Sequence, residues 1–411
     1  MHLIRRNHTV DRLQFDKFFS FSGDVLKINQ AELTDYVLRD LSGFELDFKI
    51  ASPGLSQRII HITDVVMPSY KETGPAFPGW TGPKKTNGHG VTHHIQNLAI
   101  AQSFLYPGIQ DGLMDMSGQG SVYAPLSSLH LLVMIVNLTD LTKPKSELAP
   151  ELNMMNLRAA EYVGKLLINE EGVDTNYELV KDQKHPKVGY AYFIQAQGPL
   201  RNVHLYADDC VNMTPKLVHP NEILDGALVS GNYIIACQKN PTWFHQNNPV
   251  ILEAYNRHNK EICFSGVIIS TEQSLLEGKQ QNADIIAKIA MEQQWKGIIL
   301  TQEGGGHADV DLMLTAEACE DAGIKVVMLI NEIAGPKGAL PPLVSWSDKA
   351  DAIVTTGNND EIIILPSVEE VIGGDKIAGD RFAEEQLITS LGIIYASTNQ
   401  LGATKMTTTE Y

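Results

Sequence analysis

The stretch GIILTQEGGGHADVDLMLTAEACEDAGIKVVMLI, residues 297–330, decides the fold class of this chain. Its apolar run at 297–300 predicts a buried strand, the spacing of apolar residues at 310–322 predicts a helix, and the run at 325–330 predicts a second strand. A strand, a helix and a strand in this order indicate two parallel strands joined by a helix that packs on the sheet.

The sequence on either side of this stretch extends the same pattern. Residues 264–269, 352–355 and 362–365 predict further strands, and residues 281–293 predict a helix with an apolar side. We therefore expect residues 261–411 to form a parallel α/β domain of the doubly wound, Rossmann-like kind. In such a sheet, ligands bind beyond the carboxyl ends of the strands.

The first part of the chain has a different texture. Residues 1–145 contain short apolar and alternating runs separated by glycine and proline, which predicts a β-rich α+β domain. Residues 146–260 predict a connecting α/β region that begins with a helix at 150–171 and continues through a polar linker or surface excursion at 170–187. Three such parts fit a chain of 411 residues.

Charge and hydropathy exclude several classes of partner. The 32 Lys and Arg against 49 Asp and Glu give a net charge of −17, which argues against nucleic acid or an anionic membrane surface as the main partner. The most apolar run, residues 129–138, is too short to span a bilayer and predicts a buried strand. No apolar signal-peptide core follows the N-terminus, so we expect a cytoplasmic protein.

The four cysteines, at positions 210, 237, 263 and 319, include no Cys-x-x-Cys pair. This spacing excludes a disulfide scaffold, a zinc ribbon and the common cysteine-ligated iron–sulfur clusters. We also expect no metal at the histidines of residues 88–94, because no carboxylate accompanies them at the spacing of metal ligands.

Three polar motifs carry side chains suited to chemistry. The motif GHGVTHH at residues 88–94 holds His93, whose imidazole can donate or accept a hydrogen bond. The motif GLMDMSG at 112–118 suits a turn that presents Asp115, or an Asx turn that bonds only its own backbone. The motif QEGGGHAD at 302–309 follows a predicted strand, and its acidic groups suit an amine-bearing ligand better than a phosphate. Its candidate residues are Glu303, His307 and Asp309.

The densest group of polar side chains lies at residues 225–249, where a buried-strand pattern is flanked by amides, a thiol and a histidine. Cys237 and His245 could form a thiol nucleophile and its base, although no catalytic-cysteine signature surrounds them. A free cysteine after two isoleucines and an alanine equally suits a small core residue. Both interpretations stay open on spacing alone.

These motifs also carry a resemblance to a known family. The run SGNYIIACQKNPTWFHQNNPVI, residues 230–251, closely resembles the α-type subunit of component B of the glycine, sarcosine and betaine reductase complexes. So do residues 112–118, residues 203–221 (VHLYADDCVNMTPKLVHPN), residues 303–313 and residues 352–366. The matches keep their order and extend over nearly the whole chain.

The resemblance implies a reductive C–N cleavage in anaerobic amino acid fermentation. In that family, component B joins an α-type chain to a selenocysteine-bearing β subunit, whose selenolate attacks the carbon that carries nitrogen. The carboxymethyl selenoether then passes to selenoprotein A, so the implied partners are these two selenoproteins and a small amine-bearing acid. The glycine-type α proprotein cleaves itself at an Asn–Cys bond, and the cysteine becomes a pyruvoyl group that forms an imine with a primary amine.

This sequence departs from that pattern at the cleavage step, which would fall between Asn232 and Tyr233. Tyrosine has no β-heteroatom that can attack the preceding carbonyl, so self-cleavage at that bond is chemically excluded. A quaternary ammonium such as betaine cannot form an imine and needs none, because trimethylamine leaves as a neutral amine. We therefore expect an intact chain with no cofactor of its own that serves betaine or another N-methylated glycine, with sarcosine less favoured.

Two alternatives stay open. Cys237, four residues beyond Tyr233, could mature to a pyruvoyl group, as in a glycine- or proline-reductase-type subunit. The chain could also be a non-catalytic scaffold whose partner holds all the chemistry. The aromatic rings of Tyr233, Trp243 and Phe244 suit cation–π contact with an N-methylated cation, or ordinary core packing. The candidates for catalysis are Asn232, Tyr233, Cys237 and His245, and those for substrate binding are His93, Asp115, Trp243, Glu303, His307 and Asp309.

Overall fold

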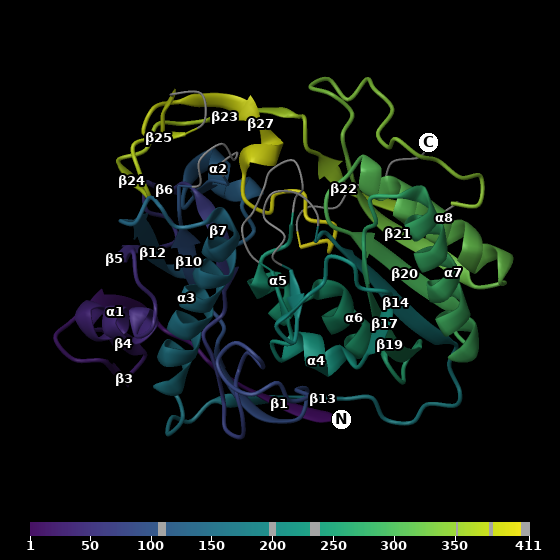
Figure 1. Cartoon of the computed structure of the whole chain (residues 1–411), viewed down its shortest axis with the longest axis horizontal. Helices are drawn as coiled ribbons and strands as arrows, with labels where there is room; N and C mark the ends of the chain where they lie inside the picture. The colour runs from purple at the N-terminus through teal and green to yellow at the C-terminus, as the bar shows by residue number, and fades with distance from the viewer. Residues whose placement is uncertain (106–111, 197–202, 231–238, 351, 378–380, 404–411) are drawn as a thin grey trace.

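The computed structural model describes residues 1–105, 112–196, 203–230, 239–350, 352–377 and 381–403. Figure 1 shows a six-stranded sheet with its helices on one side of the molecule, drawn in teal and green, and the purple and blue N-terminal sheets on the other. Short teal helices lie between these two halves, and the yellow C-terminal strands return over the N-terminal half. The mixed α/β class predicted from the sequence is confirmed.

The six-stranded sheet contains the strands predicted by the stretch at residues 297–330 and its neighbours. Four successive pairs are parallel, and only the first strand in the order is antiparallel to its neighbour. The order across the sheet is β17 (Lys216–Val218), β19 (Cys263–Thr271), β14 (Lys187–Ile194), β20 (Gly297–Gln302), β21 (Lys325–Glu332) and β22 (Ile353–Asn358). The mostly parallel sheet is thus confirmed, and the narrower Rossmann-like description stays a prediction.

Helices cover this sheet on both faces. Along β14, Ala191 and Phe193 pack in one core with α7 (Leu276–Glu292) and α8 (His307–Asp321), because alternate residues of a strand point to opposite faces. Tyr190 and Tyr192 pack in the other core, with α6 (Pro249–Arg257).

The strand order creates a topological switch point beside β14. The chain runs from β14 to β19 on one side, and α7 then carries it across to β20 on the other side. At such a switch point the connections diverge and leave room for a ligand beyond the carboxyl ends of the strands. Residues after β14 and β20 are therefore placed where a ligand site is expected.

The N-terminal half is built from two four-stranded sheets and a long helix. The first sheet has the order β13 (Val173–Glu178), β1 (His2–His8), β9 (Gly90–Ile95) and β8 (Ser69–Lys71). The second has the order β5 (Phe44–Ala51), β12 (His130–Leu138), β10 (Leu98–Ser103) and β7 (Ile62–Val66), with α3 (Lys145–Lys165) packed on β7, β8 and β10. A small sheet of β2 (Arg12–Phe15), β4 (Val25–Ile28) and β3 (Ser20–Ser22) lies near α1 (Gln30–Leu38).

One segment of this half is more regular than expected, and one expectation is confirmed. The linker or surface excursion expected at residues 170–187 contains the exposed strand β13, which pairs with β1 along six residues. Its side chains are almost all exposed, so no apolar alternation marks it in the sequence. The apolar run predicted as a buried strand is β12. Among the described residues, no helix is both long and apolar enough to cross a bilayer.

Short elements join the two halves. They are β15 (His204–Leu205), β16 (Asp208–Asp209), β18 (Leu228–Val229), α4 (Pro220–Leu224) and α5 (Thr242–Gln246). Of these, α5 packs on β7 of the N-terminal half and on β18. This position brings the polar run that follows residue 239 against both halves.

The C-terminal strands do not extend the parallel sheet. The predicted strand at 362–365 is β23 (Ile362–Leu365), but it pairs antiparallel with β27 (Leu387–Ser390) in a separate two-stranded sheet that contacts α2 (Gly118–Tyr123). A short apolar run does not encode its partner, so the sequence could not place it. Further on, β24 (Glu370–Ile372) pairs with β6 (Gln57–Ile59), which also pairs with β11 (Met114–Asp115). The remaining short elements are β25 (Lys376–Ile377), β26 (Arg381–Phe382) and the 3-10 turn Leu391–Ile393. The domain bounds at residues 145 and 260 stay predictions.

Candidate functional site at the carboxyl edge of the parallel sheet

Glu303 directly follows the carboxyl end of β20, beside the switch point, with its side chain fully buried. Its Oε2 accepts a hydrogen bond from the backbone N–H of Gln195 at 2.8 Å. Its Oε1 accepts from the backbone N–H of Asn240 at 2.8 Å and from the hydroxyl of Tyr192 at 3.1 Å. One carboxylate thus joins the ends of β14 and β20 to the segment that leads into α5.

The charge state of Glu303 is finely balanced. Burial raises the pKa of its carboxyl group to about 7, because a buried charge loses its hydration. The hydrogen bonds from Gln195, Asn240 and Tyr192 and the nearby charge of Lys239 oppose this rise. A buried carboxyl group that titrates near neutral pH is typical of functional sites.

His245, in α5, reaches the same site through Tyr192. The Tyr192 oxygen accepts a hydrogen bond from Asn240 Nδ2 at 2.9 Å and lies 3.5 Å from His245 Nδ1. Since the Tyr192 proton goes to Glu303, His245 Nδ1 carries the hydrogen in this contact and Nε2 keeps a free lone pair. Burial lowers the pKa of His245 to about 3, so the ring is neutral.

Three polar atoms at this site have no hydrogen-bond partner among the described residues: Gln195 Oε1, Asn240 Oδ1 and His245 Nε2. The side chains of Asn240 and His245 are buried. A buried polar atom without a partner is costly, and its occurrence in a folded protein calls for a water or a ligand. We define the Glu303 site as Tyr192, Gln195, Asn240, His245 and Glu303.

Asp64 fixes α5 on the N-terminal half. Its Oδ1 accepts the backbone N–H of Thr242 at 2.9 Å, and its Oδ2 lies 2.7 Å from the Thr242 hydroxyl, which also contacts the carbonyl of Ser230 at 2.6 Å. Burial raises the pKa of Asp64 to about 8. Ser230 and Asn240 are thereby both held in place. The candidates Asn232, Tyr233 and Cys237 fall between them and lie outside the described residues.

Trp243 and Phe244 follow directly in α5. Their rings meet edge to face, with centroids 5.2 Å apart. Phe244 is buried in the core, whereas Trp243 is partly exposed and its Nε1 has no hydrogen-bond partner among the described residues. Phe244 therefore packs as an ordinary core residue, and substrate contact by Trp243 stays a prediction.

The other candidates of the 302–309 motif are placed differently. His307 is the first residue of α8 and is exposed. Asp309 is buried and accepts hydrogen bonds from Gln302 Nε2 at 2.8 Å and from the backbone N–H of Val344 at 3.0 Å. Its described contacts anchor the neighbouring loop, and a role of either residue in substrate binding stays a prediction.

The candidates from the N-terminal half have partners of their own. His93, in β9, lies between His8 at 3.2 Å and Glu72 at 3.1 Å. Both carboxylate oxygens of Asp115, in β11, accept hydrogen bonds from the guanidinium of Arg58, at 2.6 and 2.9 Å. Arg58 also donates to backbone carbonyls of the returning C-terminal segment. No described hydrogen bond or ion pair joins His93 or Asp115 to the Glu303 site.

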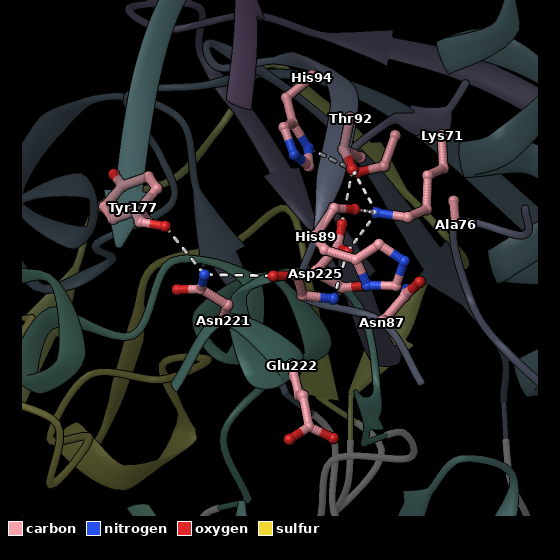
Figure 2. Close-up of polar contacts among 12 residues, drawn as sticks. Lys71, Ala76, Asn87, His89, Thr92, His94, Tyr177, Asn221, Glu222 and Asp225 are labelled. Carbon is pink, nitrogen blue, oxygen red and sulfur yellow. Dashed lines mark hydrogen bonds and ion pairs between the residues drawn. The ribbon is translucent and has the colours of Figure 1, made fainter. Parts of the chain in front are cut away.

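Figure 2 shows a second buried polar cluster, centred on Asp225. Asp225 Oδ2 accepts from Lys71 Nζ at 2.5 Å and from the backbone N–H of Gly88 at 2.8 Å, and Oδ1 accepts from the Thr92 hydroxyl at 2.6 Å. Lys71 also donates to the carbonyl of His89 at 2.6 Å. We call these five residues the Asp225 cluster. Its charges pair with each other, so it fixes the glycine–histidine loop.

The sequence reasoning missed three residues of the Glu303 site: Tyr192, Gln195 and Asn240. The sequence held a signal for two of them. The apolar run at 188–194, which contains Tyr192, predicts a buried strand, and the polar Gln195 follows its carboxyl end. Among the described residues, no group of three His, Cys, Asp or Glu side chains is placed to hold a metal ion. The described cysteines 210, 263 and 319 are buried free thiols.

Comparison with known protein sequences gives matches that extend over nearly the whole chain. The sequence model of the glycine/sarcosine/betaine reductase component B subunits matches residues 1–409. Component B subunits alpha and beta of the glycine reductase complex of Acetoanaerobium sticklandii are 34% identical over 431 aligned residues, covering 100% of both chains. The sarcosine and betaine reductase component B alpha subunits of Peptoclostridium acidaminophilum are each 33% identical, covering 88% and 91% of this chain and 86% and 88% of theirs.

No solved structure matches the chain at a significant level. The family match, by contrast, spans the parallel sheet, the Glu303 site and the N-terminal half together. The chain belongs to the glycine/sarcosine/betaine reductase component B family.

Proposed function

We propose that this chain is the substrate-binding subunit of component B of a selenoprotein-dependent reductase that acts on an N-methylated glycine. The observation that carries the proposal is Tyr233, which follows Asn232 at the position where the resemblance to the family implies the self-cleaving cysteine. Overall identity favours no substrate, because relatives named for glycine, sarcosine and betaine are all 33–35% identical.

The chemistry of the substrate explains why a chain without that cysteine can work. A selenolate on the partner subunit attacks the methylene carbon, a C–Se bond forms, the C–N bond breaks, and its electron pair stays on nitrogen. A fully methylated nitrogen such as that of betaine is permanently charged, so it cannot form an imine and leaves as a neutral amine in this step. It therefore needs no imine, and the subunit needs no pyruvoyl group.

The Glu303 site supplies what such a substrate requires from this chain. Glu303 offers a buried carboxylate for the positive nitrogen, and binding of a cation beside it favours the ionised form over the neutral one. Trp243 is not part of this site but lies two residues before His245 in α5, and its partly exposed ring suits cation–π contact with N-methyl groups. These two features support a methylated ammonium as the recognised group.

The intact mass of the purified chain tests the proposal. We expect a single species with the mass of all 411 residues. Reconstituted with its selenoprotein partner, the complex should release a methylated amine from an N-methylated glycine. Release of ammonia from glycine alone would contradict the proposal.

A second candidate is a pyruvoyl subunit matured at Cys237, the nearest residue with a suitable side chain. It predicts two fragments, residues 1–236 and 237–411, the second of which begins with a pyruvoyl group. A scaffold role without substrate binding predicts that substrate leaves the melting temperature of the isolated chain unchanged, because only a ligand that binds the folded state stabilises it.

A further inference from the structure

Asp64, in β7, joins the N-terminal half to the segment that leads into the Glu303 site. Its Oδ1 lies 2.9 Å from the backbone nitrogen of Thr242 and 2.9 Å from that of Val65. Both N–H groups are donors, so Oδ1 accepts two hydrogen bonds. Its Oδ2 lies 2.7 Å from the Thr242 hydroxyl oxygen. The two oxygens of this carboxyl group therefore have different surroundings.

The hydroxyl proton of Thr242 already has another acceptor. Thr242 Oγ1 lies 2.6 Å from the carbonyl oxygen of Ser230, which can only accept, and 3.0 Å from the Ser230 backbone nitrogen, which can only donate. A hydroxyl has one proton and two lone pairs, and the Ser230 carbonyl takes the proton. The contact between Thr242 Oγ1 and Asp64 Oδ2 then needs a proton from Asp64. All of these contacts are hydrogen bonds together only when Asp64 is a neutral carboxylic acid.

The carboxyl group of Glu303 has no such conflict. Its partners are two backbone N–H groups and the Tyr192 hydroxyl, and each of them has a proton to donate. An ionised Glu303 satisfies them all. An ionised Asp64, by contrast, competes with the Ser230 carbonyl for the single proton of Thr242. One buried acceptor then stays unpaired, which is costly.

The surroundings of Asp64 also favour the neutral form. The side chain is buried, and α3, α5 and β10 pack against its strand. The groups that these elements bring to it are Asn156, Thr242 and Gln102, all of them uncharged. Burial raises the pKa of Asp64 to about 8, because an ionised carboxylate would lose its hydration there. The direction of this shift agrees with the count of protons.

We propose that Asp64 is a positioning residue that works only as a neutral acid, whose hydrogen bond to Thr242 keeps Asn240 in place on Glu303. The inference rests on the proposed function and adds a proton-dependent control of the same site. Thr242 follows Asn240 by two residues, and the Asn240 backbone N–H donates to Glu303 Oε1 at 2.8 Å. Ionisation of Asp64 disturbs its contact with Thr242, so it also displaces the Asn240 donor.

The pH dependence of the reconstituted complex tests the proposal. We expect kcat/KM for amine release to fall about tenfold between about pH 7 and pH 9, because the protonated fraction of a group with a pKa of about 8 falls by that factor. Asp64→Asn keeps the pattern of the neutral acid, since its amide oxygen accepts and its amide nitrogen donates. This variant should remain active and should not show the fall. A fall of the same size in Asp64→Asn would overturn the proposal.

Variants of Thr242 test the partner of Asp64. Thr242→Val removes the hydroxyl that links Asp64 to Ser230, and kcat/KM should fall about tenfold or more, whereas Thr242→Ser keeps the hydroxyl and should retain most of the activity. Thr63→Val is the matched control on β7, because it removes a buried hydrogen bond to Gln102 Oε1 at 2.8 Å and leaves Asp64 intact. Its pH profile should be that of the natural chain. Unchanged kcat/KM in Thr242→Val would contradict the proposal.

Infrared difference spectra separate the failure of this inference from that of the proposed function. At pH 7, the spectrum of the natural full chain minus that of Asp64→Asn should contain the carbonyl band of a neutral carboxylic acid. A carboxylate band in its place would overturn the inference alone. Absence of amine release from every N-methylated glycine would overturn the proposed function, and the infrared band would still decide whether Asp64 is neutral.

Discussion

The Asp225 cluster and the Glu303 site are both built around a fully buried carboxylate, but they are neutralised in opposite ways. Asp225 has the ammonium of Lys71 at 2.5 Å, with both side chains buried. Glu303 is held by two backbone N–H groups and one hydroxyl, and burial raises its pKa to about 7. Asp225 is held in a direct ion pair that serves the fold, whereas Glu303 bonds neutral donors, with Lys239 acting as a nearby charge, and can change its charge when a cation binds.

The largest effect should come from breaking the pair in the Asp225 cluster. Lys71→Met leaves Asp225 buried without its counter-charge, and we expect a loss of about 3–5 kcal/mol in the free energy of unfolding, measured with denaturant. Lys84→Met is the control, because its ion pair with Asp208 is exposed and should contribute less than about 1 kcal/mol. Equal losses in the two variants would show that Asp225 does not depend on Lys71.

The pH dependence of stability should follow Glu303. Its folded-state pKa of about 7 lies above the ordinary value of 4.5, so the folded protein binds this proton more tightly than the unfolded chain. The contribution is complete below pH 4.5 and is lost as the pH rises to about 7, on the order of 3 kcal/mol in total. The difference in unfolding free energy between the natural chain and Glu303→Gln should change over this range. Parallel curves would place the pKa of Glu303 near its ordinary value.

Tyr192→Phe should separate function from stability. It removes the donor to Glu303 and the acceptor for Asn240, so we expect a loss of about 1–3 kcal/mol together with a strong loss of amine release. Tyr190→Phe is the matched control on the same strand, since its hydroxyl bonds Thr301 at 2.6 Å outside the Glu303 site. Similar losses of amine release in both variants would mean that the strand, and not the site, is affected.

The smallest effect on stability should come from His307. Its side chain is exposed, so His307→Ala should change the free energy of unfolding by less than about 0.5 kcal/mol. A large rise in KM without a change in stability would make His307 a substrate contact and extend the site to the surface of α8. An unchanged KM would confine recognition to buried groups.

Part of the candidate site could be predicted because local sequence determines it. Glu303 was found from its place directly after a predicted strand, and His245 from the polar run after residue 239. Tyr192, Gln195 and Asn240 were missed because their value depends on three distant segments meeting at one carboxylate. Asp115 was predicted to bind substrate because it is a carboxylate on a turn. The structure instead pairs it with Arg58, which is 57 positions away in the sequence, so local sequence could not reveal this partner.

The sequence by itself determined the strands and helices between residues 264 and 365, since their apolar periodicity is a local property, but not the short strands that follow. It also excluded self-cleavage between residues 232 and 233, because tyrosine has no β-heteroatom that can attack the preceding carbonyl. Only the tertiary structure decided that β23 pairs outside the parallel sheet. It also decided that Asp225 forms an ion pair with Lys71, whereas Glu303 is held by backbone N–H groups and a hydroxyl. Pairing and burial arise from contacts between segments far apart in the chain, and these contacts set the charge on each group.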